Sequence, residues 1–118
     1  MTKVIIAGAA GRMGRRIGYM INEHPNLQVA AGFERSDSPD LGKDIGELGG
    51  YGSTGITVAD GLDAVIDQGD VIIDFTFHAA TMQIARRAAE KNRPMVIGTT
   101  GLSPENLQEL AELTKNFP

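Results

Sequence analysis

The chain has 118 residues, a formal net charge of −4 and no cysteine. This length allows one domain of ordinary size. The lack of cysteine excludes a disulfide framework, a thiolate metal site and a cysteine nucleophile, and it fits a reducing cytoplasm. The negative charge argues against a nucleic-acid-binding surface. The apolar stretch near the N-terminus is too short for a signal sequence or a membrane span. We therefore expect a cytoplasmic protein that binds neither membrane nor nucleic acid.

Apolar runs of strand length alternate along the chain with segments of helical length. Strands are expected over residues 3–8, 28–34, 56–59, 70–76 and 94–98. Helices are expected over 12–24 and 79–92, from Ser103 onward, and briefly through Leu62, Val65 and Ile66. Residues 35–55, rich in Gly, Ser and Asp, are interpreted as a long irregular connection. The alternation predicts a single α/β domain with a Rossmann-like, doubly wound parallel sheet and helices on both faces.

A glycine-rich turn, Gly8-Ala9-Ala10-Gly11-Arg12-Met13-Gly14, lies between the first strand and the first helix. Gly8 permits a sharp turn, Gly11 permits close approach of a pyrophosphate, and Gly14 permits close packing of the helix on the sheet. The N–H groups and dipole of the helix N-terminus favour phosphate binding. The G-x-x-G-x-x-G spacing differs from the G-x-G-x-x-G fingerprint, so the turn alone leaves a purely structural role open.

An acidic residue ends the second strand in the position that a dinucleotide site requires. Glu34 follows Gly14 by 20 residues, where a carboxylate can accept hydrogen bonds from adenosine ribose hydroxyls. Arg35 comes next and could pair with a 2′-phosphate. The pair favours binding of both NADH and NADPH. A solvated acid and base at a strand end is the competing interpretation.

The segment Gly98-Thr99-Thr100-Gly101 follows the fifth strand, beside the Thr76 end of the fourth. Ligands of open α/β sheets lie outside the carboxyl ends of the strands. Small residues and hydroxyls here leave room for a nicotinamide ring and offer hydrogen bonds to its carboxamide or to a substrate carboxylate. A plain turn with Ser103 as a helix cap explains the pattern equally well from position alone.

Taken together, these motifs resemble the dihydrodipicolinate reductase family over the whole chain. The resemblance is carried by five segments in family order: residues 4–15 (VIIAGAAGRMGR), Glu34-Arg35, residues 41–46 (LGKDIG), Asp74-Phe75-Thr76 and residues 96–101 (VIGTTG). In this family the cofactor is NADH or NADPH. The resemblance implies cofactor contacts from Gly8, Ala9, Ala10, Gly11, Arg12, Met13, Glu34, Arg35, Phe75, Thr76, Gly98, Thr99 and Thr100.

The resemblance also implies that Thr100 reaches toward the substrate, a cyclic dicarboxylate that is reduced to tetrahydrodipicolinate in diaminopimelate and lysine biosynthesis. Phe77 departs from the family, because some members have an arginine near the adenine at this position. The family's His-His-x-x-Lys and Pro-Ser-Gly-Thr segments have no counterpart. We therefore expect residues 1–118 to be an NAD(P)-binding domain without the substrate-binding, catalytic domain. It would contain no catalytic residue and no metal site, and it would be inactive alone and derived from a homotetramer.

Two other classes of protein fit the same motifs. One is another oxidoreductase, such as a homoserine or semialdehyde dehydrogenase, although a thiol mechanism has no cysteine in this segment. The other is a non-enzymatic nucleotide-sensing or CoA-binding regulator, which needs only the phosphate turn and an adenine slot. Competition between NADH, NADPH and CoA would separate these classes.

Overall fold

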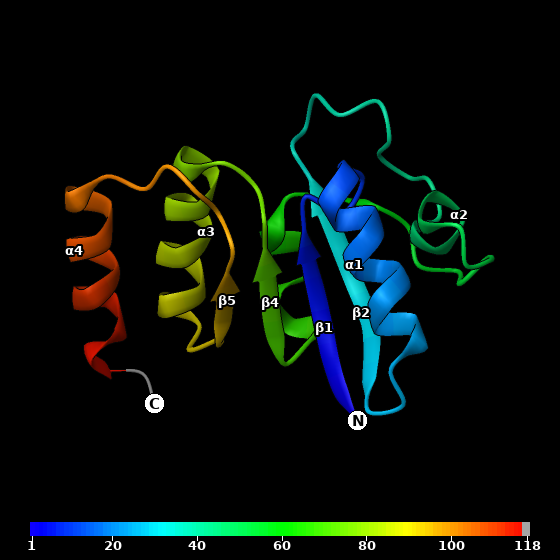
Figure 1. The fold of residues 1–118 in the computed structure, drawn as a ribbon, viewed down its shortest axis with the longest axis horizontal. Helices are drawn as coiled ribbons and strands as arrows, with labels where there is room; N and C mark the ends of the chain where they lie inside the picture. Colours follow the sequence, from blue (N-terminus) through cyan, green and yellow to red (C-terminus); the bar gives the residue numbers. More distant parts are fainter. Residues whose placement is uncertain (117–118) are drawn as a thin grey trace.

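The protein, as a computed structural model that describes residues 1–116, contains one five-stranded parallel sheet in the order β3-β2-β1-β4-β5 (Figure 1). The strands are β1 (Thr2–Ala7), β2 (Leu27–Glu34), β3 (Ala59–Asp60), β4 (Val71–Asp74) and β5 (Met95–Ile97). The α-helices are α1 (Arg12–Glu23), α2 (Ile45–Gly49), α3 (His78–Glu90) and α4 (Pro104–Leu113). Short 3-10 turns are η1 (Leu62–Ala64), η2 (Ile66–Gln68) and η3 (Thr114–Asn116). The predicted Rossmann-like fold is confirmed.

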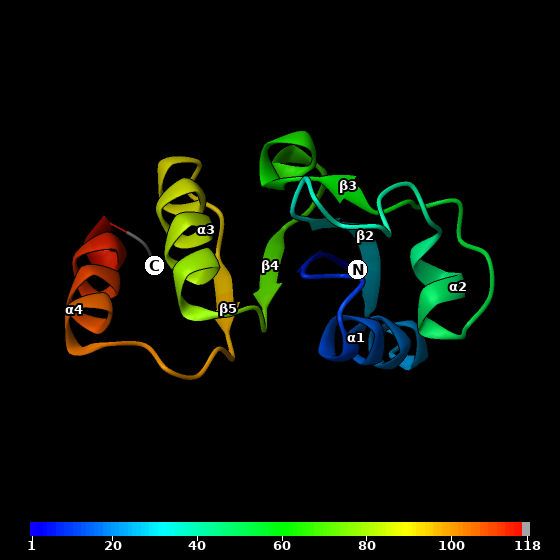
Figure 2. The same cartoon turned by 90° about the horizontal axis from the view of Figure 1, so that it is seen from above.

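Both faces of the central strands are buried, as the continuous apolar run of β1 predicts. Ile5 and Ala7 pack on one face with Ile84 of α3, and Val4 and Ile6 pack on the other with Ile21 of α1. Figure 2 shows α1 and the η1–η2 segment on opposite sides of the strands. In both views α4 lies beside α3, at the β5 end of the sheet. The alternation of side chains along β1 thus builds two cores, one on each face.

The strand order reverses between β1 and β4. From β1 the chain crosses through α1 to β2, whereas from β4 it crosses through α3 to β5 on the other side. Ala7, the last residue of β1, pairs with Asp74, the last residue of β4. The two connections leave these neighbouring strand ends in opposite directions. A crevice at such a reversal is where open α/β sheets bind their ligands.

The segment from residue 35 to residue 68 differs from expectation in three ways. The connection predicted to be irregular contains α2, which begins after Asp44, whose carboxylate accepts from the N–H groups of Gly46 and Glu47. The third strand is Ala59–Asp60 instead of 56–59, and only these two residues pair with β2. The brief helix expected through Leu62 consists of two 3-10 turns. Glycines made α2 hard to recognise, because they lower helix propensity.

The last helix begins as predicted. Ser103 caps α4: its hydroxyl accepts from the Asn106 N–H at 3.0 Å, and Asn106 Oδ1 accepts from the Ser103 N–H at 3.1 Å. Pro104 occupies the first turn, where its missing N–H leaves no hydrogen bond unmade. None of the helices within residues 1–116 has the length and apolar character needed to cross a membrane.

Candidate functional site

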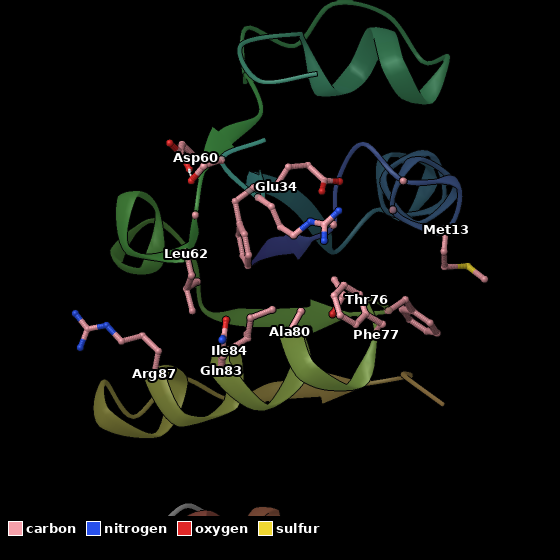
Figure 3. Close-up of a pocket in the computed structure, with 18 of the residues that line it drawn as sticks. Met13, Glu34, Asp60, Leu62, Thr76, Phe77, Ala80, Gln83, Ile84 and Arg87 are labelled. Atoms are coloured by element: carbon pink, nitrogen blue, oxygen red, sulfur yellow. Dashed lines mark hydrogen bonds between the residues drawn. The ribbon is translucent and has the colours of Figure 1, made fainter. Parts of the chain in front are cut away.

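A cleft of about 780 Å³ lies at the carboxyl ends of the strands, beside the reversal in strand order (Figure 3). Its walls come from the glycine-rich turn, from the ends of β2, β3 and β4, and from one side of α3. The lining residues are Gly8, Gly11, Arg12, Met13, Gly14, Phe33, Glu34, Arg35, Ser36, Asp60, Gly61, Leu62, Asp63, Phe75, Thr76, Phe77, Ala80, Gln83, Ile84 and Arg87. A cleft of this volume is large enough for a nucleotide-sized ligand.

The glycine-rich turn is held by backbone contacts that leave no room for a side chain at Gly14. Gly8 has φ +73°, a left-handed conformation that favours glycine. The N–H groups of Gly8 and Ala9 both donate to the Phe33 carbonyl of β2, at 3.1 and 3.2 Å. A Cβ on Gly14 would lie 2.0 Å from the Gly8 carbonyl oxygen. Close packing of α1 on the turn therefore requires glycine at position 14, as the sequence predicted.

Gly11, the N-cap of α1, is exposed and has no side chain with which to cap the helix. The first N–H groups of a helix have no acceptor within the helix itself. Added to the helix dipole, such N–H groups attract an anion. The mouth of the turn therefore offers donors and positive potential, and the missing Cβ of Gly11 keeps it open. These are the properties that a binding site for pyrophosphate requires.

Glu34 has a structural role that the sequence did not reveal. Its Oε2 accepts a hydrogen bond from the buried N–H of Ala10 at 2.9 Å, which ties the end of β2 to the glycine-rich turn. Oε1, the other carboxylate oxygen, makes none of the hydrogen bonds found among residues 1–116. One carboxylate can thus fix the turn and still present an acceptor to hydroxyl groups in the cleft.

The β2–β3 end of the cleft has an uneven charge distribution. Asp60 of β3 pairs with Glu34 of β2, so a second carboxylate lies at this end, and its Oδ1 accepts from the Ser36 hydroxyl at 2.8 Å. The guanidinium of Arg35 lies 5.6 Å from the centre of the Phe77 ring, within range of a cation–π interaction. Arg35 also pairs with Asp37 at 3.6 Å, and its side chain is 68% exposed. This end therefore combines carboxylates with the solvent-accessible guanidinium of Arg35.

Four residues of α3 form a wall of the cleft that the sequence did not predict. Ala80, Gln83, Ile84 and Arg87 face the ends of β2 and β3 in Figure 3. Their spacing is i, i+3, i+4 and i+7, which places them on one side of a helix. Arg87 donates to Asp63 at 2.6 Å and so joins α3 to η1 across the cleft. The helical spacing was visible in the sequence, but the direction in which this side of the helix faces was not.

The structure separates the predicted contact residues into three groups. Eight of them line the cleft: Gly8, Gly11, Arg12, Met13, Glu34, Arg35, Phe75 and Thr76. Ala9 and Ala10 are buried beneath the turn. Gly98, Thr99 and Thr100 are not among the lining residues. The Phe75 ring packs over Gly98, where a Cβ would lie 2.1 Å from a ring carbon. The segment after β5 therefore lies directly behind the β4 end of the cleft.

The loop between β2 and β3 is held by Asp44. Its carboxylate accepts from the N–H groups of Gly46, Glu47, Thr54 and Gly55 at 2.8 to 3.2 Å. Desolvation raises the pKa of Asp44, but the four backbone donors outweigh it and lower the pKa from 3.8 to about 2. No group of three or more His, Asp or Glu side chains that could hold a metal ion occurs within residues 1–116.

A parallel sheet with a glycine-rich turn at its switch point, and an acidic residue at the end of the next strand, defines a dinucleotide-binding domain. Residues 2–118 match the family described as Dihydrodipicolinate reductase, N-terminus. The 4-hydroxy-tetrahydrodipicolinate reductases of Desulfotalea psychrophila and Syntrophus aciditrophicus are 56% and 42% identical over 118 residues. The chain belongs to the dihydrodipicolinate reductase family and corresponds to its N-terminal, dinucleotide-binding part.

Solved structures agree with this assignment. A structure described as dipicolinate-bound dihydrodipicolinate reductase from Paenisporosarcina sp. TG-14 superimposes with a TM-score of 0.76 and 26% identity, covering 98% of this chain and 43% of that one. An aspartate semialdehyde dehydrogenase with NADP from Candida albicans has a TM-score of 0.67 at 18% identity, covers 85% of this chain and 30% of that one, and shares the fold. The chain spans 44% of the length of the curated relatives it matches.

Proposed function

We propose that this chain is the cofactor-binding domain of a 4-hydroxy-tetrahydrodipicolinate reductase and binds both NADH and NADPH. The match of all 118 residues to reductases of that name carries the proposal. The cleft at the switch point, with its glycine-rich turn, supports it independently. The bound cofactor would supply a hydride from its reduced nicotinamide. The acceptor would be an unsaturated cyclic dicarboxylate that loses water and becomes tetrahydrodipicolinate, on the route to diaminopimelate and lysine.

The residues around the cleft support a proposed position for each half of the cofactor. The pyrophosphate would lie over Gly8–Met13, where the exposed, cap-free start of α1 supports anion binding. The adenosine ribose would donate to the second oxygen of Glu34. The adenine would lie between the β3 end and the exposed side of α3. The nicotinamide would extend toward Phe75, Thr76 and the segment Gly98–Thr100, with Thr100 toward the substrate.

The choice between the two cofactors would depend on two residues of opposite charge. Arg35 is exposed and able to reach a 2′-phosphate, which favours NADPH. Asp60 lies in the same end of the cleft and would repel that phosphate, which favours NADH. Phe77 supplies a flat apolar surface under Arg35 in place of the arginine of some family members. We infer that both cofactors bind and that Arg35 is needed mainly for NADPH.

The remaining expectations concern the whole protein. We propose that residues 1–118 form one domain and work with a second domain that binds the dicarboxylate and supplies the catalytic proton. The chain itself would provide no catalytic residue. A homotetramer in the cytoplasm is the expected state of the complete enzyme. The chain spans 44% of the length of the curated relatives it matches, which supports this division of labour.

Calorimetric titration of the chain with NADH, NADPH and CoA tests the proposal. We expect both dinucleotides to bind and CoA to bind more weakly. Arg35→Ala should lower the affinity for NADPH by about tenfold, because it removes a charge-assisted contact. The affinity for NADH should change by less than about twofold. Arg16→Ala is the matched control, since Arg16 is an exposed arginine of α1 that lies over Tyr19, away from the cleft lining. Tight binding of CoA with no binding of either dinucleotide would support a regulator instead.

A further inference from the structure

Asp74, at the end of β4, is a fully buried carboxylate with a relative exposure of 0%. None of the ion pairs found within residues 1–116 includes it. Burying a carboxylate without a cation is unfavourable unless several hydrogen-bond donors replace water. An apolar residue would satisfy the packing at this position without that requirement. The groups that donate to Asp74 therefore indicate what the residue is for.

Three threonines supply the donors. Asp74 Oδ1 accepts from the N–H and the hydroxyl of Thr76, at 2.9 and 2.5 Å. Asp74 Oδ2 accepts from the hydroxyls of Thr81 at 2.6 Å and Thr99 at 3.2 Å. The hydroxyls of Thr81 and Thr99 also lie 2.7 Å apart. Thr76 belongs to the β4–α3 connection, Thr81 to α3 and Thr99 to the β5–α4 connection, so one carboxylate joins three segments.

Two of these segments border the ligand-binding end of the sheet. Thr76 lines the cleft, and its methyl group contacts the turn: a Cβ on Gly8 would lie 2.9 Å from Thr76 Cγ2. On the other side, the N–H of Gly98 donates to the backbone carbonyl of Asp74 at 2.8 Å, and Thr99 follows directly. Asp74 therefore lies between the glycine-rich turn and the segment Gly98–Thr100, and it is hydrogen-bonded to residues on both sides.

We infer that Asp74 is a positioning residue for the nicotinamide half of the cofactor. Through Thr76 it sets the β4 end of the cleft, and through Thr81 and Thr99 it holds the segment Gly98–Thr100 against that end. Asp74 is fully buried and is not among the residues that line the cleft, so it would act on the cofactor only through its neighbours. The inference rests on the proposed function, because it assigns the nicotinamide to this end. Its signature is selective: losing the cluster should impair the nicotinamide half and spare the adenosine diphosphate half.

The test compares NADH with ADP-ribose, which keeps the adenosine, the pyrophosphate and the second ribose but lacks the nicotinamide. Thr99→Val preserves the side-chain shape and removes the hydroxyl. In calorimetric titration we expect Thr99→Val to lower the affinity for NADH by about tenfold and the affinity for ADP-ribose by less than about twofold. Thr99→Ser restores the hydroxyl and should restore NADH affinity. Thr114→Val, at the exposed end of α4, controls for a general effect of replacing threonine with valine.

Asp74→Asn tests the carboxylate directly, because one acceptor oxygen becomes an amide donor facing the threonine hydroxyls. The same selective loss is expected. If this variant fails to fold, as circular dichroism would show, the Thr99→Val and Thr99→Ser pair decides. Equal losses of affinity for NADH and ADP-ribose, or no loss of affinity for NADH, would overturn the positioning role. Failure of the unchanged chain to bind either ligand would overturn the proposed function itself, which is a separate outcome.

Discussion

The glycine-rich turn between β1 and α1 and the loop between β2 and β3 are held in opposite ways. In the turn, residues 8–14 are fixed by close backbone packing, and a Cβ at Gly14 would meet the Gly8 carbonyl at 2.0 Å. In the loop, one side chain, Asp44, collects four backbone N–H groups spread over residues 46–55. The turn therefore depends on the absence of a side chain at Gly14, and the loop depends on the charge of Asp44. Substitution of Gly14 should therefore disrupt the turn, and protonation of Asp44 at low pH should open the loop.

The largest effect is expected from Gly14→Ala, which places a methyl group against backbone atoms that cannot move aside. We expect the free energy of unfolding to fall by about 3 kcal/mol, together with loss of NADH binding. Gly11→Ala is the matched variant, because its Cβ would meet nothing nearer than the Gly8 oxygen at 3.4 Å. It should change stability by less than about 1 kcal/mol and still block the pyrophosphate. Urea unfolding and NADH titration measure both quantities. Equal stabilities for the two variants would contradict close packing at Gly14.

An intermediate effect is expected at Glu34, a side chain that helps to hold the turn. Glu34→Ala leaves the buried Ala10 N–H without its acceptor and should lower the free energy of unfolding by about 1–3 kcal/mol. Glu34→Gln keeps an oxygen that can accept from Ala10 and should retain most of the stability. Chemical unfolding of both variants, with NADH titration beside it, separates the structural from the binding role. A Glu34→Ala variant as stable as the unchanged chain would show that the turn does not need the hydrogen bond between Glu34 and Ala10.

The smallest effect is expected from acidifying the Asp44 loop. Its pKa in the folded chain is about 2, below the ordinary value of 3.8. Because the folded pKa is the lower one, the stabilisation is complete above about pH 4 and disappears as the pH falls toward 2. Amide chemical shifts of Gly46 and Gly55 across this range should report opening of the loop. Asp44→Asn should lack the transition at those amides. Parallel titration curves in both proteins would assign the change to other carboxylates.

Most of the fold could be predicted from the sequence, because its signals are local. The apolar run of β1 and the three- and four-residue apolar spacing of α1 each lie within one element, and both elements form as expected. The cap at Ser103 and Pro104 is likewise a pattern of neighbouring residues. The weakest predictions lie between residues 35 and 68. There α2 was missed because its glycines lower helix propensity, and β3 was placed too early because its bounds depend on pairing with β2.

The sequence by itself determined the sheet, the glycine-rich turn and the acidic residue at the end of β2, because periodicity and glycine placement within a few neighbouring residues specify them. Only the tertiary structure decided which side of α3 faces the cleft, that Glu34 holds Ala10, and that Asp74 joins Thr76, Thr81 and Thr99. Thr99 lies 25 residues beyond Asp74 in the chain. Such groups meet because parallel strands bring the ends of separate crossovers to one edge of the sheet, and no local pattern records that meeting.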